Sequence, residues 1–251
     1  MDRVRYLRST LREVIYQVRF PKILKLTDGA PVAFQELIMG EFPNYNVQKN
    51  ETLVEVNGKA QQKVSENNHS FISQSGKTKI NLTSTFIAIS TLEYDRWEKL
   101  REKIKTVIDK FYTCYNIPGI QRIGLRYQNI ITRSKLELEN ISWSELLDTK
   151  ILGPLANHEE LTTRYETVFE IKNRENCFTS RHFKLVKDQP DNELSFLLDC
   201  DYYYAGFFPK ESVIRLSDEL HVLSQHFIQD THREILLTAM QPQELEEWRT
   251  I

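Results

Sequence analysis

The chain contains only three cysteines in 251 residues, Cys114, Cys177 and Cys200, and they lie far apart. Without a Cys-x-x-Cys pair, neither a disulfide framework nor a zinc ribbon is indicated, and a reducing cytoplasm is the expected location. No window approaches 18 consecutive apolar residues, and no apolar run follows the first six residues, MDRVRY. We therefore expect neither a membrane span nor a signal peptide.

Recognised catalytic and nucleotide-binding motifs are also missing. The eight glycines form no Walker loop, dinucleotide fingerprint or Gly-x-Ser-x-Gly turn. His221 and His226 are five residues apart, whereas a zinc pair on one helix face needs a spacing of three or four. We therefore predict no metal and no cofactor, and we expect His221 to bond a backbone group near a sheet.

Charge is close to balanced overall, with a net charge of −2, which gives no support to a general polyanion-binding role. The distribution is uneven. Residues 1–26 carry seven basic and two acidic side chains, whereas residues 211–251 carry three basic and eight acidic ones. This pattern is compatible with self-association, with docking to a charged partner, with RNA contact by the basic N-terminal arm, or with solvated faces alone.

Periodicity in the first half predicts strands at residues 11–20, 52–57, 70–75 and 77–90. Asn57-Gly58 and Ser75-Gly76 are typical hairpin turns. A short helix is expected between Pro31 and Pro43, and a long helix at 92–116, where apolar residues recur at steps of three and four. Ile87, Ala88 and Ile89 indicate a central strand, because that segment is apolar on both faces.

The second half shows a similar order. Strands are expected at 120–132, 165–173, 177–187 and 194–203, a short helix capped by Ser142 and Glu145, and a long helix at 211–229. A further helix is expected after an N-cap at Thr231. We predict an α+β fold of two pseudo-duplicated β-α-β-β-β-α halves, 1–118 and 119–251, in one compact unit. The two long helices are expected to pack on one face of antiparallel sheet.

Several segments resemble an uncharacterised bacterial protein family of similar length that is sporadically distributed among genomes. They are residues 11–21 (LREVIYQVRFP), Phe34-Gln-Glu with Phe42-Pro43, residues 122–129 (RIGLRYQN), residues 196–201 (FLLDCD), and Leu220-His221 with Phe227 and Thr231. The Gly-Leu-Arg-Tyr-x-Asn segment is the most specific. The first segment departs from the family, since Ser9-Thr10 stands where a Pro-Leu type of pair is usual. The resemblance implies a compact bacterial protein, associated with mobile or defence loci, and no established activity.

Two sets of residues are candidates for chemistry. Asp199 and Asp201 lie two apart on a predicted strand and so share a face, where they could bind a hard cation or act as acid and base. Arg122 and Arg126 share a strand face and could grip a carboxylate or phosphate, and Asn129 faces the other side. The alternative, which we favour, is structural, with Arg126 paired to Asp199 or Asp201 across the sheet.

The same two alternatives apply to Arg19, at the corresponding place in the first half. Three hypotheses for function follow. The first is a non-enzymatic protein-interaction or regulatory subunit of a bacterial toxin–antitoxin or defence-type locus, with a protein partner or self-association. The second is an RNA- or nucleotide-binding module that uses Arg122, Arg126 and the N-terminal arm. The third is an enzyme with Asp199, Asp201 and Arg126 in a concave site.

Overall fold

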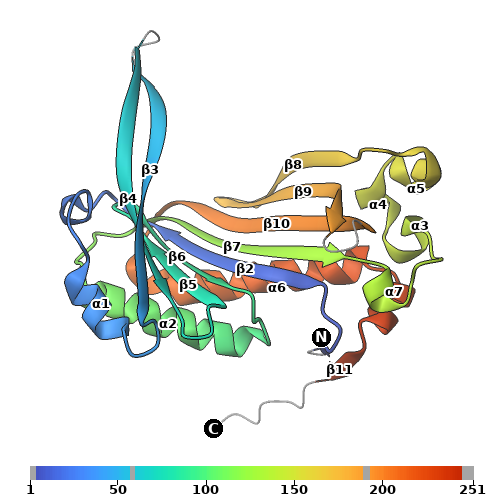
Figure 1. Cartoon of the computed structure of the whole chain (residues 1–251), viewed down its shortest axis with the longest axis horizontal. Coiled ribbons are helices and arrows are strands. Elements are labelled where there is room, and N and C mark those ends of the chain that lie inside the picture. The colour runs from blue at the N-terminus through green and yellow to red at the C-terminus, as the bar shows by residue number, and fades with distance from the viewer. Residues whose placement is uncertain (1–3, 57–59, 189–192, 245–251) are drawn as a thin grey trace. The chain divides into compact units, whose positions relative to one another are not determined.

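The computed structural model describes residues 4–56, 60–188 and 193–244 (Figure 1). The fold is α+β, as predicted, and these residues form two sheets, of nine and two strands. The strand order of the large sheet is β3-β4-β5-β6-β2-β7-β10-β9-β8, and the small sheet pairs β1 (Val4–Tyr6) with β11 (Pro242–Glu244). No helix among the described residues combines the length and apolar character needed to cross a bilayer.

The chain divides into two compact units, and each is built from separate stretches of sequence. Unit 1 comprises residues 1–13, 126–202 and 219–251, and unit 2 comprises 14–125 and 203–218. The predicted halves, in contrast, are continuous segments. The strands β2 (Leu11–Arg19), β7 (Ile120–Ile131) and β10 (Glu193–Phe208) and the helix α6 (Val213–Thr231) each contribute residues to both units.

Unit 2 is organised around the buried face of β2. Val14, Tyr16 and Val18 alternate on that face and are at most 1% exposed, as expected for a strand with one face against the core. The Tyr16 hydroxyl accepts a hydrogen bond from Ser217 of α6, and Phe20 stacks on Phe111 of α2 (Trp97–Cys114). Both long helices therefore contact the same face of β2.

The predicted long helix at 92–116 corresponds to α2, which begins five residues later. The apolar stripe that predicts it is the buried face of the helix: Trp97, Leu100, Ile104, Val107, Ile108 and Phe111. The helix is anchored to α6 because Asp218 accepts hydrogen bonds from the indole nitrogen of Trp97 at 2.8 Å and from Nε of Arg101 at 2.8 Å.

The strands of unit 2 differ from the prediction in number and length. The predicted strand 77–90 is two strands, β5 (Thr78–Leu82) and β6 (Phe86–Thr91), because Thr83 bonds the backbone of Thr85 and Phe86 and forms a turn. With β1 included, the described residues of the first half contain six strands, two more than the predicted β-α-β-β-β-α pattern. As predicted, β6 is internal, between β5 and β2, and Ser75-Gly76 forms a turn in which Gly76 has φ of +72°.

A long hairpin is the other departure. β3 (Asn44–Val56) begins eight residues before the predicted strand, and β4 (Ala60–Ile72) begins ten residues early. Their register runs from Asn44↔Ile72 to Val56↔Ala60. The predicted turn at Asn57-Gly58 lies outside the described residues. In Figure 1 this hairpin projects beyond the shorter strand β5. The polar composition of residues 44–51 and 60–69 gives no apolar alternation, so sequence patterning missed these parts.

Unit 1 contains the edge hairpin of β8 (Glu166–Arg174) and β9 (Cys177–Asp188). Both ends of each strand agree with the predicted bounds to within one residue. The helix α3 (Trp143–Leu146) has the predicted capping box between Ser142 and Glu145. Short helices follow at α4 (Thr149–Leu152) and α5 (Leu155–His158), and α1 (Val32–Ile38) is the corresponding short helix of unit 2.

The helix α7 (Glu234–Ala239) begins later than predicted, with Arg233 in the N-cap position. Thr231 does not cap α7, because its hydroxyl donates to the carbonyl of Phe227 inside α6.

Candidate functional site

Arg126 of β7 and Asp199 of β10 form a bidentate ion pair within unit 1. Nε of Arg126 donates to Oδ1 of Asp199 at 2.6 Å, and Nη2 donates to Oδ2. Gln128, two residues along the same face of β7, donates from Nε2 to Oδ2 at 3.1 Å. The side chain of Asp199 is 6% exposed and that of Arg126 is 42% exposed, so the carboxylate lies beneath its partners.

The electrostatics of this cluster favour a charged, fixed guanidinium. The hydrogen bond to Asp199 raises the pKa of Arg126, and the nearby charges of Asp201 and Glu13 raise it further, against the opposing effect of burial. Three donors occupy the two oxygens of Asp199, which leaves little room for a metal or a substrate proton. Of the two alternatives for Arg126, the structure contains the cross-strand ion pair. Asp201 lies on the same strand face, half-buried.

Asn129 and Tyr127 point to the opposite face of β7. Asn129 is buried and its side-chain oxygen accepts a hydrogen bond from the Thr10 hydroxyl at 3.2 Å. Tyr127 shares a hydrogen bond of 2.9 Å with Nδ1 of His221 on α6. The Nδ1 atom of His221 thus bonds a side-chain hydroxyl, and the backbone partner expected from the sequence stays a prediction. These contacts connect β7 to its neighbours in unit 1 and present no reactive group to solvent.

Arg122 and Arg19 meet in unit 2 at the side chain of Gln17. Nη1 of Arg122 and Nε of Arg19 both donate to Oε1 of Gln17, at 3.3 Å and 3.1 Å. The guanidinium of Arg122 also lies 4.4 Å from the ring centroid of Tyr203. Gly124 makes this possible, since a Cβ there would be 2.4 Å from Nη1 of Arg122. Gly124, the glycine of the Gly-Leu-Arg-Tyr segment, therefore leaves the space that the guanidinium of Arg122 occupies on the same strand.

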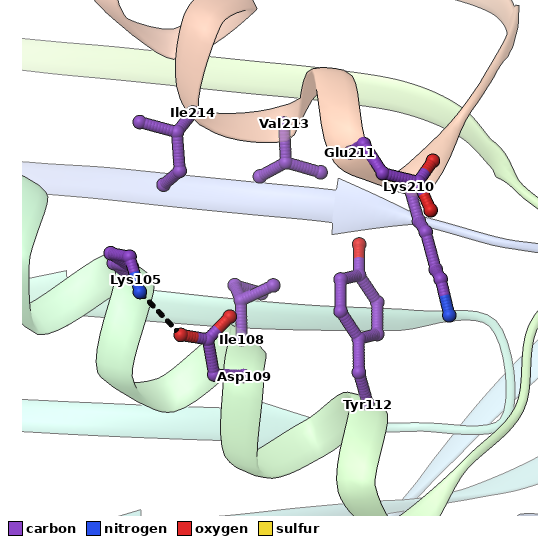
Figure 2. A pocket seen from close by; sticks show the side chains of 8 residues that line it. All are labelled: Lys105, Ile108, Asp109, Tyr112, Lys210, Glu211, Val213 and Ile214. Atoms are coloured by element: carbon purple, nitrogen blue, oxygen red, sulfur yellow. Dashed lines mark hydrogen bonds and ion pairs between the residues drawn. The ribbon is translucent and has the colours of Figure 1, made fainter.

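A hollow in unit 2 lies between α2 and the start of α6 (Figure 2). Its volume is about 270 Å³, slightly below the usual range for small-molecule sites of about 300–1,000 Å³. Its rim carries Lys105, which pairs with Asp109 at 2.7 Å, and Lys210, whose ammonium lies 5.5 Å from the ring of Tyr112. Burial, with Glu211 and Asp109 nearby, raises the pKa of Tyr112, so its phenol stays protonated at neutral pH.

A second hollow of about 230 Å³ lies in unit 1, lined by Arg8, Ser9, Thr10, Ile130, Thr132, Lys135 and Leu136. Neither hollow contains Arg126, Asp199 or Asp201, the three residues that the enzyme hypothesis needs in one cleft. Within the described residues, no three His, Cys, Asp or Glu side chains form a metal-binding group. The three cysteines are free thiols, and burial raises the pKa of Cys200 to about 12, so this thiol is not a nucleophile at neutral pH.

Two backbone surfaces that sequence patterning did not identify are more distinctive than any side-chain cluster. The first is the outer part of the β3–β4 hairpin, the nine pairs from Gln48↔Asn68 to Val56↔Ala60, which we call the arm. Pairing of β4 with β5 begins only at His69↔Leu82, so the arm has no third strand among the described residues. The second is β8, the last strand of the large sheet. In the sequence, Asn57-Gly58 is a hairpin turn signal with a polar segment of similar length on each side. That arrangement is the signal that could have indicated the arm.

Comparison of the sequence with protein families and with curated proteins found no match.

Proposed function

We propose that this chain is a non-enzymatic protein-interaction subunit that uses the arm, residues 48–56 and 60–68, to bind a partner protein. The observation that carries the proposal is the register. The nine pairs of the arm extend roughly 30 Å beyond the pairing with β5, at about 3.3 Å per residue. An isolated two-stranded ribbon is only marginally stable in water. A partner that pairs with its free edges would satisfy the outward backbone groups.

The test is a shortened chain in which Gln48 and Asn68 are joined by an Asn-Gly turn, a sequence suited to a two-residue hairpin. This change keeps the pairs from Asn44↔Ile72 to Val47↔His69, which belong to the four-pair contact with β5. The residues removed lie outside that pairing, and among them Glu66 contacts the sheet, where it accepts hydrogen bonds from the backbone nitrogen and the hydroxyl of Ser84. We therefore expect the shortened chain to fold, with a small decrease in its thermal unfolding midpoint.

Tagged full-length and shortened chains would be recovered from the cells that naturally contain the protein, and bound proteins would be quantified. We expect a stoichiometric partner with the full chain and its loss with the shortened chain. Titration of the purified partner then measures the affinity of each form. Equal binding by both forms would contradict the role of the arm. A toxin–antitoxin or defence-type locus in a bacterial cytoplasm remains our proposed setting.

RNA or nucleotide binding is a second candidate, which the cluster of Arg19, Arg122 and Tyr203 in unit 2 favours. Cationic groups beside an aromatic ring on a sheet are a common way to hold single-stranded RNA. A filter-binding titration with a single-stranded RNA oligonucleotide should then show retention that falls with salt and is weakened by Arg19→Gln and Arg122→Gln. The matched control is Arg164→Gln, an exposed arginine of unit 1. No salt-dependent retention would remove this candidate.

A further inference from the structure

The outer strand of unit 1, β8, has an open edge within the described part of the chain. Its neighbour in the sheet is β9, and β8 ends the strand order. The strand contains no proline, and two apolar side chains on it are exposed, Val168 by 64% and Phe169 by 37%. Sheet edges in monomeric proteins are usually short, bulged or proline-containing, because an open edge can pair with another chain. The edge of β8 has charged side chains and an irregularity between Lys172 and Arg174, but its seven regular residues still present Val168 and Phe169 to solvent.

The layer beneath β8 is also incomplete. The ring of Phe169 packs edge-on against that of Phe183 of β9, with 5.7 Å between the ring centroids. The ring of Phe183 in turn stacks on that of Phe227 of α6, with 5.9 Å between the centroids. The helix thus contacts β9 directly, while the ring of Phe169 stays partly open to solvent at the margin of the layer.

The sequence of β8 is suited to pairing with itself. The regular part of the strand is Glu166-Thr-Val-Phe-Glu-Ile-Lys172, because a register shift lies between Lys172 and Arg174. Two copies of β8 that pair antiparallel in one continuous sheet are related by a two-fold axis perpendicular to the sheet. Side chains directly opposite each other then point to the same face, so an odd-numbered residue pairs with an odd-numbered one and an even-numbered residue with an even-numbered one. Centred on Phe169, the self-pairing puts Glu166 opposite Lys172 of the second copy at both ends, and puts Phe169 against its own equivalent.

Neighbouring registers are less favourable. Centred on Val168, the pairing puts Glu166 opposite Glu170 twice, and centred on Glu170 it puts that glutamate opposite itself. Centred on Ile171, only residues 170–172 pair within the regular strand, because the irregularity interrupts the remainder. The register centred on Phe169 uses all seven residues and creates no like-charge pair. Like charges directly opposite each other destabilise a strand pair, whereas opposite charges and aromatic pairs stabilise it.

We infer that a second copy of this chain binds at β8, by antiparallel pairing of residues 166–172 about Phe169. The occupant is a copy of the same chain because the ends of the strand carry complementary charges under two-fold symmetry. Glu166, which also pairs with Arg164 at 3.0 Å and with Nε2 of His182 at 2.8 Å in its own chain, would meet Lys172 of the second copy. This inference is independent of the proposed partner of the arm, since the arm lies in unit 2 and β8 lies in unit 1.

Disulfide trapping tests the register. In the full chain, Phe169→Cys places two thiols on directly opposite residues, whose Cα atoms lie roughly 4.5–5.5 Å apart, within the range a disulfide spans. Val168→Cys is the matched control. It is more exposed than Phe169, but the two copies of residue 168 are diagonal neighbours roughly 7–8 Å apart. We expect mild oxidation to give a covalent dimer with Phe169→Cys and at least tenfold less with Val168→Cys. Equal trapping of the two variants would overturn the register.

Charge reversal tests the association itself. Sedimentation equilibrium should show a dimer for the native chain, and a tenfold or greater increase in the dissociation constant for Lys172→Glu or Glu166→Lys alone. An equimolar mixture of these two variants should recover dimer, because each strand then meets opposite charges. Lys150→Glu, an exposed change in α4, is the control and should leave the dimer unchanged. A native chain that sediments only as a monomer, or a mixture that fails to recover dimer, would refute the inference.

Discussion

Arg126 and Asp199 differ in their access to water. Because of this difference, replacing one or the other should change the free energy of unfolding by different amounts. Asp199 is 6% exposed and Arg126 is 42% exposed. Removing the arginine leaves a buried carboxylate with one donor, Gln128, whereas removing the acid leaves a guanidinium that can still be hydrated. The pair is therefore best understood as a support for β7 and β10 within unit 1.

We expect Arg126→Met to lower the free energy of unfolding by about 3 kcal/mol, the usual cost of leaving a buried charge unpaired. Asp199→Asn should cost about 1 kcal/mol, since the amide still accepts a hydrogen bond. Urea unfolding at neutral pH measures both. The double variant Arg126→Met/Asp199→Leu should recover much of the loss, and equal costs for the two single variants would contradict this account.

His232 should make the stability of the protein depend on pH. Burial lowers its pKa to about 4, from an ordinary value near 6.5. Because the folded-state pKa is lowered, the unfolded chain binds the proton more readily, so stability present above about pH 6.5 is lost as the pH falls toward 4. The full loss from this group is about 3 kcal/mol, from about 1.4 kcal/mol per pKa unit.

Urea unfolding at pH 7, 5.5 and 4.5 measures this dependence. We expect His232→Asn to flatten the decline relative to the native chain, and His158→Asn, which removes an exposed histidine, to leave it unchanged. A native-like decline in the His232→Asn chain would show that other groups control acid unfolding.

At the scale of the elements, two glycines on β7 and just before it have different roles. A Cβ on Gly124 would meet the end of the Arg122 side chain, which can move aside. A Cβ on Gly119 would lie 2.6 Å from the ring of Phe207 and 2.8 Å from the backbone oxygen of Phe208. The start of β7 is therefore held against the end of β10 at Gly119, within unit 2.

We expect Gly119→Ala to cost about 2 kcal/mol, because backbone must shift to relieve the overlap. Gly124→Ala should change stability by less than about 1 kcal/mol, since only a flexible side chain moves and the loss of glycine favours the strand. Thermal unfolding of the two variants compares these costs directly. A larger loss at Gly124 would mean that the contact between Arg122 and Tyr203 is a major stabilising interaction.

At the scale of the whole molecule, the chain passes between the two units inside continuous elements, at 13/14 in β2, 125/126 in β7, 202/203 in β10 and 218/219 in α6. Neither unit is a single segment. The fragments 1–118 and 119–251 each lack part of a unit, so we expect neither to fold when expressed alone.

We also expect the two units to unfold together, because shared strands and a shared helix couple them covalently. Trp97 lies in unit 2 and Trp143 in unit 1, and both are buried. In a Trp248→Phe background, which leaves one tryptophan in each variant, Trp97→Phe and Trp143→Phe should each show fluorescence and circular dichroism transitions with the same urea midpoint. Separate midpoints for the two probes within either variant would indicate independent units.

Local sequence patterns were enough to predict many of the helices and strands of this protein, though not all of their bounds. Alternation at Val14, Tyr16 and Val18 predicted β2, three- and four-residue steps predicted α2 and α6, and Ser142 with Glu145 predicted the cap of α3. Each of these patterns involves residues only a few positions apart in the sequence, so it can be recognised without knowledge of the tertiary structure. The α+β class follows from their order. An internal duplication stays a prediction, as does the resemblance to a bacterial family.

Only the tertiary structure decided which distant segments meet. The pairing of Arg126 with Asp199 joins residues 73 positions apart, and Arg122 meets Gln17 across 105 positions. The polar strands of the arm pair through backbone groups, which leave no apolar signature in the sequence. Which strand stands at the sheet edge depends on strand order, and that order is set by nonlocal packing rather than by local periodicity. Both proposals are drawn from properties of that order: the open edge at β8, and an arm that has no third strand among the described residues.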